Sequence, residues 1–535
     1  MRSLASSPPP PPDDDEVYLA AVEGGGTTFV VSIARVVRHR GDDDEDDIGR
    51  RPTTGSLSIG PARLQILDTA TLPPRDDMTG RVESWTPARI VGATCSFLVE
   101  SRARHVPGGR RLSAVGVATF GPAGVDPASG DGSYGRILPG SPKREWRGVD
   151  LLAPIAEACG IPPSSSGSSS GGDGDRGGWR WVGFDTDVNA PALAEFRHRR
   201  HLRELTRARV GVVDGGEKPL TSLSYVTVGT GVGVGLIVNS MPVHGLLHPE
   251  GGHVAIRPLD GDDFDGYSWG RESSPYGGRG TVEGVASSVA LTERYLRMTE
   301  GEKMMMKKKT TGRTRKDDGN NNDNGDNDDN DDNDDNDDND DNDDVISREV
   351  LSTLPDNHPI WDHASNAIAN LCVSILLLTS CQKIVLGGGV MKRHALYGAV
   401  RSRVWTLLNG YLDSVYELGA EERLDDVIVG GSWAEVGSGL VGAFALALDA
   451  YDDGVIAAGG GGGGGGRGGR GREANNGAGE EAKKDDVGST VKGGRMTVYD
   501  ERRRSFVIGA LAGMGLSFGC ALATSALGRV MGQRR

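Results

Sequence analysis

Two stretches decide the fold: residues 17–34, VYLAAVEGGGTTFVVSIA, and residues 223–239, LSYVTVGTGVGVGLIVN. In each, a short run of apolar and β-branched residues leads into a glycine-rich turn, and a second such run follows. This pattern is typical of a β-hairpin, because glycine supplies the backbone freedom that a tight turn needs. The hairpins stand about 200 residues apart, so we expect one in each of two similar lobes.

The remaining foldable sequence alternates between strand and helix patterns. Strands that alternate with helices predict the α/β fold class. We expect strands at 111–120, 180–184 and 383–386, and helices at 188–200, 362–380 and 435–450.

Several stretches have a composition that cannot bury enough apolar surface to offset the entropy of ordering them. One of them, 317–344, holds 16 Asp and no basic residue, and without it the net charge of −16 becomes zero. The acidity therefore says nothing about partners of the folded part, and a basic face for nucleic acid is absent. We expect disorder at 8–12, 42–47, 162–178, 303–344 and 459–475.

The chain has five cysteines without a C-x-x-C pair, and its first 16 residues contain no apolar stretch. These features favour a reduced, cytoplasmic protein without a secretory signal. The predicted organisation is a disordered N-terminus (1–16), an N-terminal lobe (17–192), a C-terminal lobe (193–450), a linker (451–504) and a tail helix (505–528).

The tail, 505–528, has 24 residues without a charge and is flanked by arginines on both sides. That length is enough to span a bilayer. The alternative is a Gly/Ala-rich helix that docks on the folded domain. Length and flanking charge favour a C-terminal transmembrane helix that tethers the protein to an intracellular membrane.

The glycine-rich turns also suggest a ligand. Both offer unobstructed backbone N–H groups and hydroxyls, which suit phosphate oxygens. Neither is a Walker loop or a dinucleotide fingerprint, because no Gly-Lys-Ser/Thr follows and neither opens a helix. Two such turns, one in each lobe, suggest that two domains bind one nucleotide between them.

Two polar clusters accompany these turns. Asp185 and Asp187 follow a predicted strand, where α/β proteins bind ligands at the carboxyl ends of strands. Either residue could instead cap the following helix, and Asp185 is the better candidate for that. Residues 248–253, HPEGGH, could serve a metal, acid–base chemistry or sugar hydroxyls, and spacing does not choose among these.

Six motifs follow one another along the chain: Glu23 with Gly25-Gly26-Thr27, FGP at 120–122, Asp187-x-Asn189, GTGVGVG at 229–235, HPExGH at 248–253 and LGGGVM at 386–391. This order resembles the ROK family of sugar kinases. Within that family, Ser141-Pro142-Lys143, 243–253 (VHGLLHPEGGH) and 282–287 (VEGVAS) resemble the bacterial-type fructokinases. The resemblance covers nearly all of 17–300 and 345–450.

The resemblance implies an actin-like ATPase (ribonuclease H-like) fold whose two lobes close over ATP and a sugar, with Mg²⁺ as cofactor. It implies that Asp187 is the catalytic base, and it is compatible with a homodimer. Asn189, Glu250, His253, Glu283 and Lys143 would bind the sugar; Gly25, Gly26, Thr27, Thr230 and Gly231 would hold the phosphates; Gly388 and Gly389 would face the adenosine.

Two positions depart from the family pattern. Thr28 stands where the first loop of the family usually has Lys. We expect the residue at this position to adjust the reaction without taking part in the chemical step. The family's structural zinc needs Cys and His after the HPExGH segment, but residues 254–284 contain neither. We therefore predict no structural zinc.

The leading hypothesis is the ATP-dependent conversion of D-fructose to D-fructose 6-phosphate. A kinase for mannose, glucose or N-acetylmannosamine is the nearest alternative. A membrane-tethered, sugar-binding pseudokinase is a further one, motivated by Thr28 and the missing zinc ligands. A transcriptional repressor of the same family is excluded, because no helix-turn-helix fits before Glu23.

Overall fold

The structure is a computed structural model of the 535-residue chain. One compact unit contains every described residue, and the predicted tail at 505–528 lies outside them. Within the described ranges, no helix is long and apolar enough to cross a membrane. These ranges are 16–25, 28–37, 55–74, 83–163, 179–210, 218–268, 274–311, 349–412, 424–433 and 436–459.

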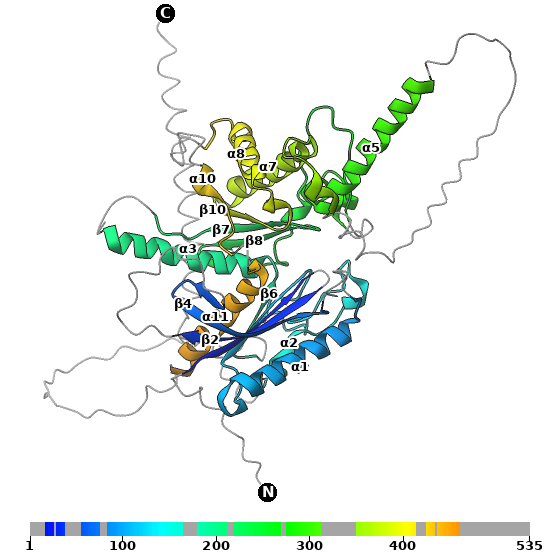
Figure 1. The fold of residues 1–535 in the computed structure, drawn as a ribbon. Coiled ribbons are helices and arrows are strands. Elements are labelled where there is room, and N and C mark those ends of the chain that lie inside the picture. Colours follow the sequence, from blue (N-terminus) through cyan, green and yellow to red (C-terminus); the bar gives the residue numbers. More distant parts are fainter. Residues whose placement is uncertain are drawn as a thin grey trace, which may run out of the picture. The chain divides into compact units, whose positions relative to one another are not determined.

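The first sheet contains the first predicted hairpin. Its strand order is β3-β4-β2-β1-β5-β6 (Figure 1). Strands β1 and β2 pair antiparallel, whereas β5 and β6 continue the sheet from β1 in parallel. The strands are β1 (Tyr18–Gly24), β2 (Phe29–Val37), β3 (Ser56–Ile59), β4 (Ala62–Leu72), β5 (Ala114–Thr119) and β6 (Val182–Thr186).

The second sheet contains the second predicted hairpin, formed by β7 and β8 in antiparallel pairing. Its order is β11-β10-β7-β8-β9, with β10 parallel to β7 and β11. The two mixed sheets and their helices confirm the predicted α/β class. The strands are β7 (Leu223–Val228), β8 (Val232–Val238), β9 (Met241–Pro242), β10 (Lys383–Gly387) and β11 (Ile428–Gly430).

The first sheet buries both faces, as the alternation of side chains along β1 shows. Leu19 and Ala21 join the core beside helix α11 (Ser438–Gly459), whereas Tyr18, Ala20 and Val22 join a second core beside helix α1 (Pro87–His105). Side chains alternate across a strand. A central strand that is covered on both faces therefore becomes continuously apolar.

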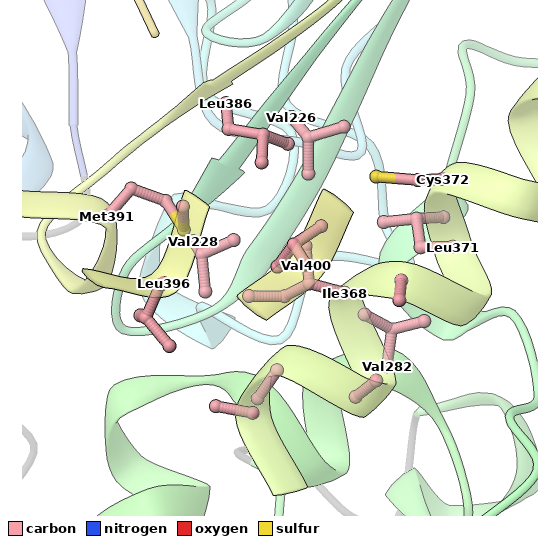
Figure 2. Packing of buried hydrophobic residues seen from close by; sticks show 14 of the residues in the cluster. Val226, Val228, Val282, Ile368, Leu371, Cys372, Leu386, Met391, Leu396 and Val400 are labelled. Carbon is pink, nitrogen blue, oxygen red and sulfur yellow. The ribbon is translucent and has the colours of Figure 1, made fainter. Parts of the chain in front are cut away.

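The second sheet is covered in the same way. Helix α3 (Asn189–Val210) packs on one face, together with α11 in the same core. On the other face lies the cluster of Figure 2, in which Val226 and Val228 of β7 meet Ile368 of α7 (Ile360–Thr379) and Val400 of α8 (Ala395–Leu408). Helices α3 and α11 thus share one core with strands of both sheets.

The three predicted helices are present and differ from the predictions mainly at their ends, whereas the long helices α1, α5 and α8 were not predicted. Helix α5 (Ser288–Thr311) runs nine residues into the stretch predicted to be disordered from 303, and α11 reaches Gly459, within the predicted linker. Met and Lys at 303–309 are good helix formers, which explains the first extension. The shorter helices are α2 (Leu152–Ala158), α4 (Val282–Ala286) and α10 (Leu424–Val427).

The carboxyl ends of three parallel strands meet at one edge of the first sheet. Gly24, Thr119 and Thr186 end β1, β5 and β6 in neighbouring register. Ligands of α/β proteins bind at such an edge. The predicted catalytic segment, Asp185 to Asn189, begins at this edge.

Candidate active site

Asp187 stands directly after β6. Its backbone N–H donates to Thr119 O at 2.7 Å, which fixes it at the edge of the sheet. The pKa of its carboxyl is raised to about 7, chiefly by burial and then by the neighbouring carboxylates of Glu23 and Glu250, while the charge of Lys143 opposes the rise. A carboxyl that titrates near neutral pH can accept a proton from a substrate.

Glu23, at the end of β1, is the second carboxylate of this edge. One of its oxygens would clash with a side chain at Gly439, so the start of α11 approaches it closely. Burial raises the pKa of Glu23, and a hydrogen bond from the backbone N–H of Leu440 opposes the rise. The sequence analysis gave Glu23 no role, although it is the only charged residue in 17–34.

Asn189 is fully buried, and both of its polar atoms already have protein partners. Its Nδ2 donates to Asp185 Oδ1 at 3.0 Å, and its Oδ1 accepts from Leu236 N at 3.3 Å. A sugar hydroxyl would have to displace one of these bonds. The cap at the start of α3 comes from Thr186, whose hydroxyl accepts from Asn189 N at 3.1 Å.

Asp185 also contacts residues 243–253, the loop predicted to bind the sugar and therefore called the sugar loop here. His244 Nε2 lies 2.8 Å from Asp185 Oδ2. Burial lowers the pKa of His244, but the hydrogen bond and charge of Asp185 outweigh burial, so the net pKa is raised. This pair joins the end of β6 to the loop that follows β9, a contact the sequence analysis did not predict.

Glu250 and His253 lie close together in the sugar loop, 3.9 Å apart between Oε2 and Nε2. Burial raises the pKa of Glu250 to about 7, helped by the charge of Glu283. Within the described part of the chain, the buried Nδ1 of His253 has no hydrogen-bond partner. A half-buried carboxyl beside an unsatisfied imidazole nitrogen suits a ligand with several hydroxyls.

Glu283, the remaining predicted sugar ligand of this group, faces the second glycine-rich turn. Its Oε2 accepts from Val232 N at 3.0 Å, and its Oε1 accepts from the Ser268 hydroxyl at 2.7 Å. A side chain at Gly231 would lie 2.8 Å from Glu283 Oε2. Glu283 therefore supports the turn that carries Thr230 and Gly231.

Lys143 follows a loop beyond β5, and its Nζ lies 4.7 Å from the centre of the Phe120 ring. Its charge lowers the pKa of Asp187, so it stands near the candidate base. This places the predicted Lys143 at the site.

The predicted phosphate and adenosine residues are described in part. Gly25 N donates to Thr28 O at 3.0 Å across the first turn, whereas Gly26 and Thr27 lie outside the described residues. Gly388 has a φ of +90°, and a side chain there would lie 2.4 Å from Val228 O. A side chain at Gly389 would meet no atom of the described residues within 4 Å, so within this part of the chain the position is open to a ligand.

The loop after the sugar loop is held by an ion pair. Asp262 accepts two hydrogen bonds from Arg294, at 2.7 and 2.9 Å, and lies 3.0 Å from His363 Nδ1. Both members of the Arg294–Asp262 pair are almost completely buried. In the ranges that the structure describes, no group of three His, Cys, Asp or Glu is arranged to hold a metal ion.

Mg²⁺ requires a different kind of site, because it prefers one or two carboxylates together with substrate phosphates and water. Glu23 and Asp187 supply two adjacent carboxylates beside the first turn, and the charge of Glu23 raises the pKa of Asp187. A cation at this point would relieve that repulsion. The oxygen donors present therefore fit Mg²⁺ bound with a nucleotide.

Comparison with known proteins finds curated relatives and solved structures that resemble this chain. The fructokinase of Zymomonas mobilis is 28% identical over 373 residues, covering 69% of this chain and 88% of that protein. The fructokinase of Pediococcus pentosaceus is 26% identical over 336 residues, covering 63% and 80%.

Solved structures include a ROK hexokinase from Thermus thermophilus, with 17% identity, a TM-score of 0.43 and coverage of 82% of this chain and 100% of that one. A ROK family glucokinase from Streptomyces griseus, in complex with glucose and AMPPNP, has 17% identity, a TM-score of 0.42 and coverage of 81% and 99%. The sequence model of the ROK family matches residues 180–450, about half of the chain. The chain belongs to the ROK family.

Proposed function

We propose that this protein is an ATP-dependent hexose kinase that phosphorylates the 6-hydroxyl of D-fructose. The observation that carries the proposal is the position of Asp187, a carboxyl with a pKa of about 7 at the carboxyl edge of the first sheet. Membership of the ROK family and the fructokinase relatives support the reaction class and the substrate. The fold would be the two-lobed actin-like ATPase arrangement, with lobes at 17–192 and 193–450.

In the proposed reaction, the oxygen of the 6-hydroxyl attacks the γ-phosphorus of ATP while its proton passes to Asp187. The bond from the γ-phosphorus to the bridging oxygen breaks, and ADP leaves with that electron pair. Such a transfer depends mainly on positioning and on charge stabilisation. Mg²⁺, when bound near Glu23, would supply the charge neutralisation at the phosphates.

Binding roles follow from the contacts. Glu250 and His253 would hold sugar hydroxyls, since the His253 Nδ1 is buried without a partner within the described chain. Lys143 would contact the sugar or the transferring group near Asp187. Asn189 would act by orienting Asp185, and Glu283 by holding the Gly231 turn. Gly389 would face the adenosine.

The test is a coupled assay of ADP release by the full chain with Mg-ATP and fructose, mannose, glucose or N-acetylmannosamine. We expect turnover with fructose and a loss of at least about 1,000-fold in kcat for Asp187→Asn, because the isosteric amide cannot accept the proton. Turnover with a different hexose would keep the mechanism and change the substrate. Sugar and ATP binding without turnover would instead support the pseudokinase.

A further inference from the structure

The side chain of His248 connects two parts of the site that the proposed mechanism leaves unconnected. Its ring is 3% exposed. On one side, its Nε2 lies 3.2 Å from the backbone N of Ala123, just beyond β5. On the other side, its Nδ1 lies 3.4 Å from Glu250 Oε1 and 3.5 Å from Pro249 O.

These contacts define the tautomer. The N–H of Ala123 can only donate, so His248 Nε2 must accept and carries no proton. A neutral ring then carries its proton on Nδ1, where it faces acceptors on Glu250 and Pro249. Burial lowers the pKa of His248, which favours this neutral form near pH 7.

The surrounding backbone is shaped to admit the ring. A side chain at Gly121 would lie 2.8 Å from His248 Cε1. Gly121 belongs to the Phe120-Gly121-Pro122 segment that leaves β5, so the absence of a side chain there lets the ring fill the space between this segment and the sugar loop. The contacts with Ala123 and Gly121 therefore hold the ring independently of Glu250.

We propose that His248 is a positioning residue that holds the Glu250 carboxylate for the hexose. Glu250 Oε1 faces His248 Nδ1, and Oε2 faces His253 Nε2 at 3.9 Å, so the carboxylate lies between two imidazoles. Glu250 is 45% exposed, and without His248 its flexible side chain would sample other rotamers. The inference rests on the proposed function, because it takes Glu250 as a sugar ligand.

Two substitutions test the roles of the two ring nitrogens of His248 separately. In His248→Asn the amide nitrogen can replace Nδ1 and donate to Glu250, but the Ala123 N–H loses its acceptor. In His248→Gln the amide oxygen can replace Nε2 and accept from Ala123, but the donor to Glu250 is lost. If the ring only fills space, the two variants should have similar effects on hexose binding.

The experiment measures kcat and KM for the hexose and for ATP in the full chain, with His105→Gln as a control at a half-exposed histidine beside Asp68. We expect His248→Gln to raise the hexose KM about tenfold and His248→Asn less than about threefold, with the ATP KM within twofold in both. Equal hexose KM values for the two variants, or a matching rise in the ATP KM, would overturn the proposal. Thermal melting identifies a variant that fails to fold, and in that case the remaining variant is compared with the wild type.

The kinase proposal is tested separately from the role of His248. If the wild type turns over no hexose, the kinase proposal fails whatever the variants do. The same comparison is then made on the dissociation constant of the hexose by calorimetry. A ratio near one between His248→Gln and His248→Asn in that measurement overturns the positioning role as well.

Discussion

The two glycine-rich turns are alike in sequence, yet the structure holds them differently. The first turn closes on itself through the bond from Gly25 N to Thr28 O, and Phe120 N donates to Gly24 O at 3.0 Å where the turn begins. The second turn has a comparable backbone bond, from Ser288 N to Gly229 O at 2.7 Å, and a side chain holds it as well, because Glu283 accepts from Val232 N. A glycine pattern therefore locates a turn without revealing what fixes it. Rigid placement of the N–H groups is what an ATP-binding turn needs.

The largest effect is expected where β10 supports the second turn. Gly388 combines a φ of +90° with a backbone oxygen, Val228 O, at 2.4 Å from any added Cβ. Gly388→Ala should lower the free energy of unfolding by about 2 to 4 kcal/mol, since both the conformation and the contact become unfavourable. Urea unfolding measures this loss.

Gly389→Ala is the matched control, because a Cβ there meets nothing within 4 Å. We expect its unfolding free energy to stay within about 0.5 kcal/mol of the wild type, with the change confined to the KM for ATP. Equal stabilities of the two variants would show that Gly388 does not support the second turn.

A smaller effect is expected from removing the external support. Glu283→Ala removes the hydrogen bonds that Glu283 accepts from the Val232 N–H and the Ser268 hydroxyl, a loss of about 1 to 2 kcal/mol. We expect the KM for ATP to rise about tenfold. Thr28→Ala should change it less than about threefold, because the first turn uses the backbone oxygen of Thr28.

Kinetics with both substrates decide the role of Glu283. A rise in the hexose KM alone, with the ATP KM unchanged, would restore Glu283 as a sugar ligand and contradict its support of the turn. If Thr28→Ala raised the KM for ATP as much as Glu283→Ala does, the proposed difference between the two turns would be wrong.

The sequence predicted what depends on local patterns. Both hairpins and the strand that ends at Thr186 follow from short apolar runs and glycine turns. Helix α1 was missed because its buried face includes Thr94 and Ser101 besides Ile90 and Leu98, so an apolar stripe is not visible. The β3–β4 hairpin was missed as well, and most of the β4 side chains are only partly buried.

Motifs proposed the candidate site as a set of residues, but they did not predict its contacts. Asp187 and Glu250 were proposed from motifs, whereas the bond from Val232 N to Glu283 joins residues 51 positions apart. His248 lies 125 residues from Ala123. Such pairs join segments that are far apart in the sequence, and no local periodicity encodes them.

The smallest effect is expected from a change of charge at Glu23, beside the first turn. Asp187 must be deprotonated to act as a base, and burial raises its pKa to about 7, with Glu23 as the next cause. We therefore expect kcat/KM for Mg-ATP to fall as the pH drops below about 7, since this ratio reports the enzyme before the nucleotide and its cation bind. Glu23→Gln removes the neighbouring negative charge, so the pKa of Asp187 should decrease and the acid limb should move to lower pH by about one unit.

Glu283→Gln is the matched variant at the second turn, and Glu283 is not among the groups that shift the pKa of Asp187. Its acid limb should stay where the wild-type limb lies, even if its KM for ATP changes. The measurement is kcat/KM for Mg-ATP from pH 5.5 to 8.5 at saturating hexose. The variants are compared by the pH position of the acid limb, because Glu23→Gln can also lower the maximal rate. A limb that moves equally in both variants would mean that neither turn tunes the base selectively. A limb that moves only with Glu23 would assign the two turns different tasks, with the first adjusting the proton acceptor and the second presenting backbone N–H groups to ATP.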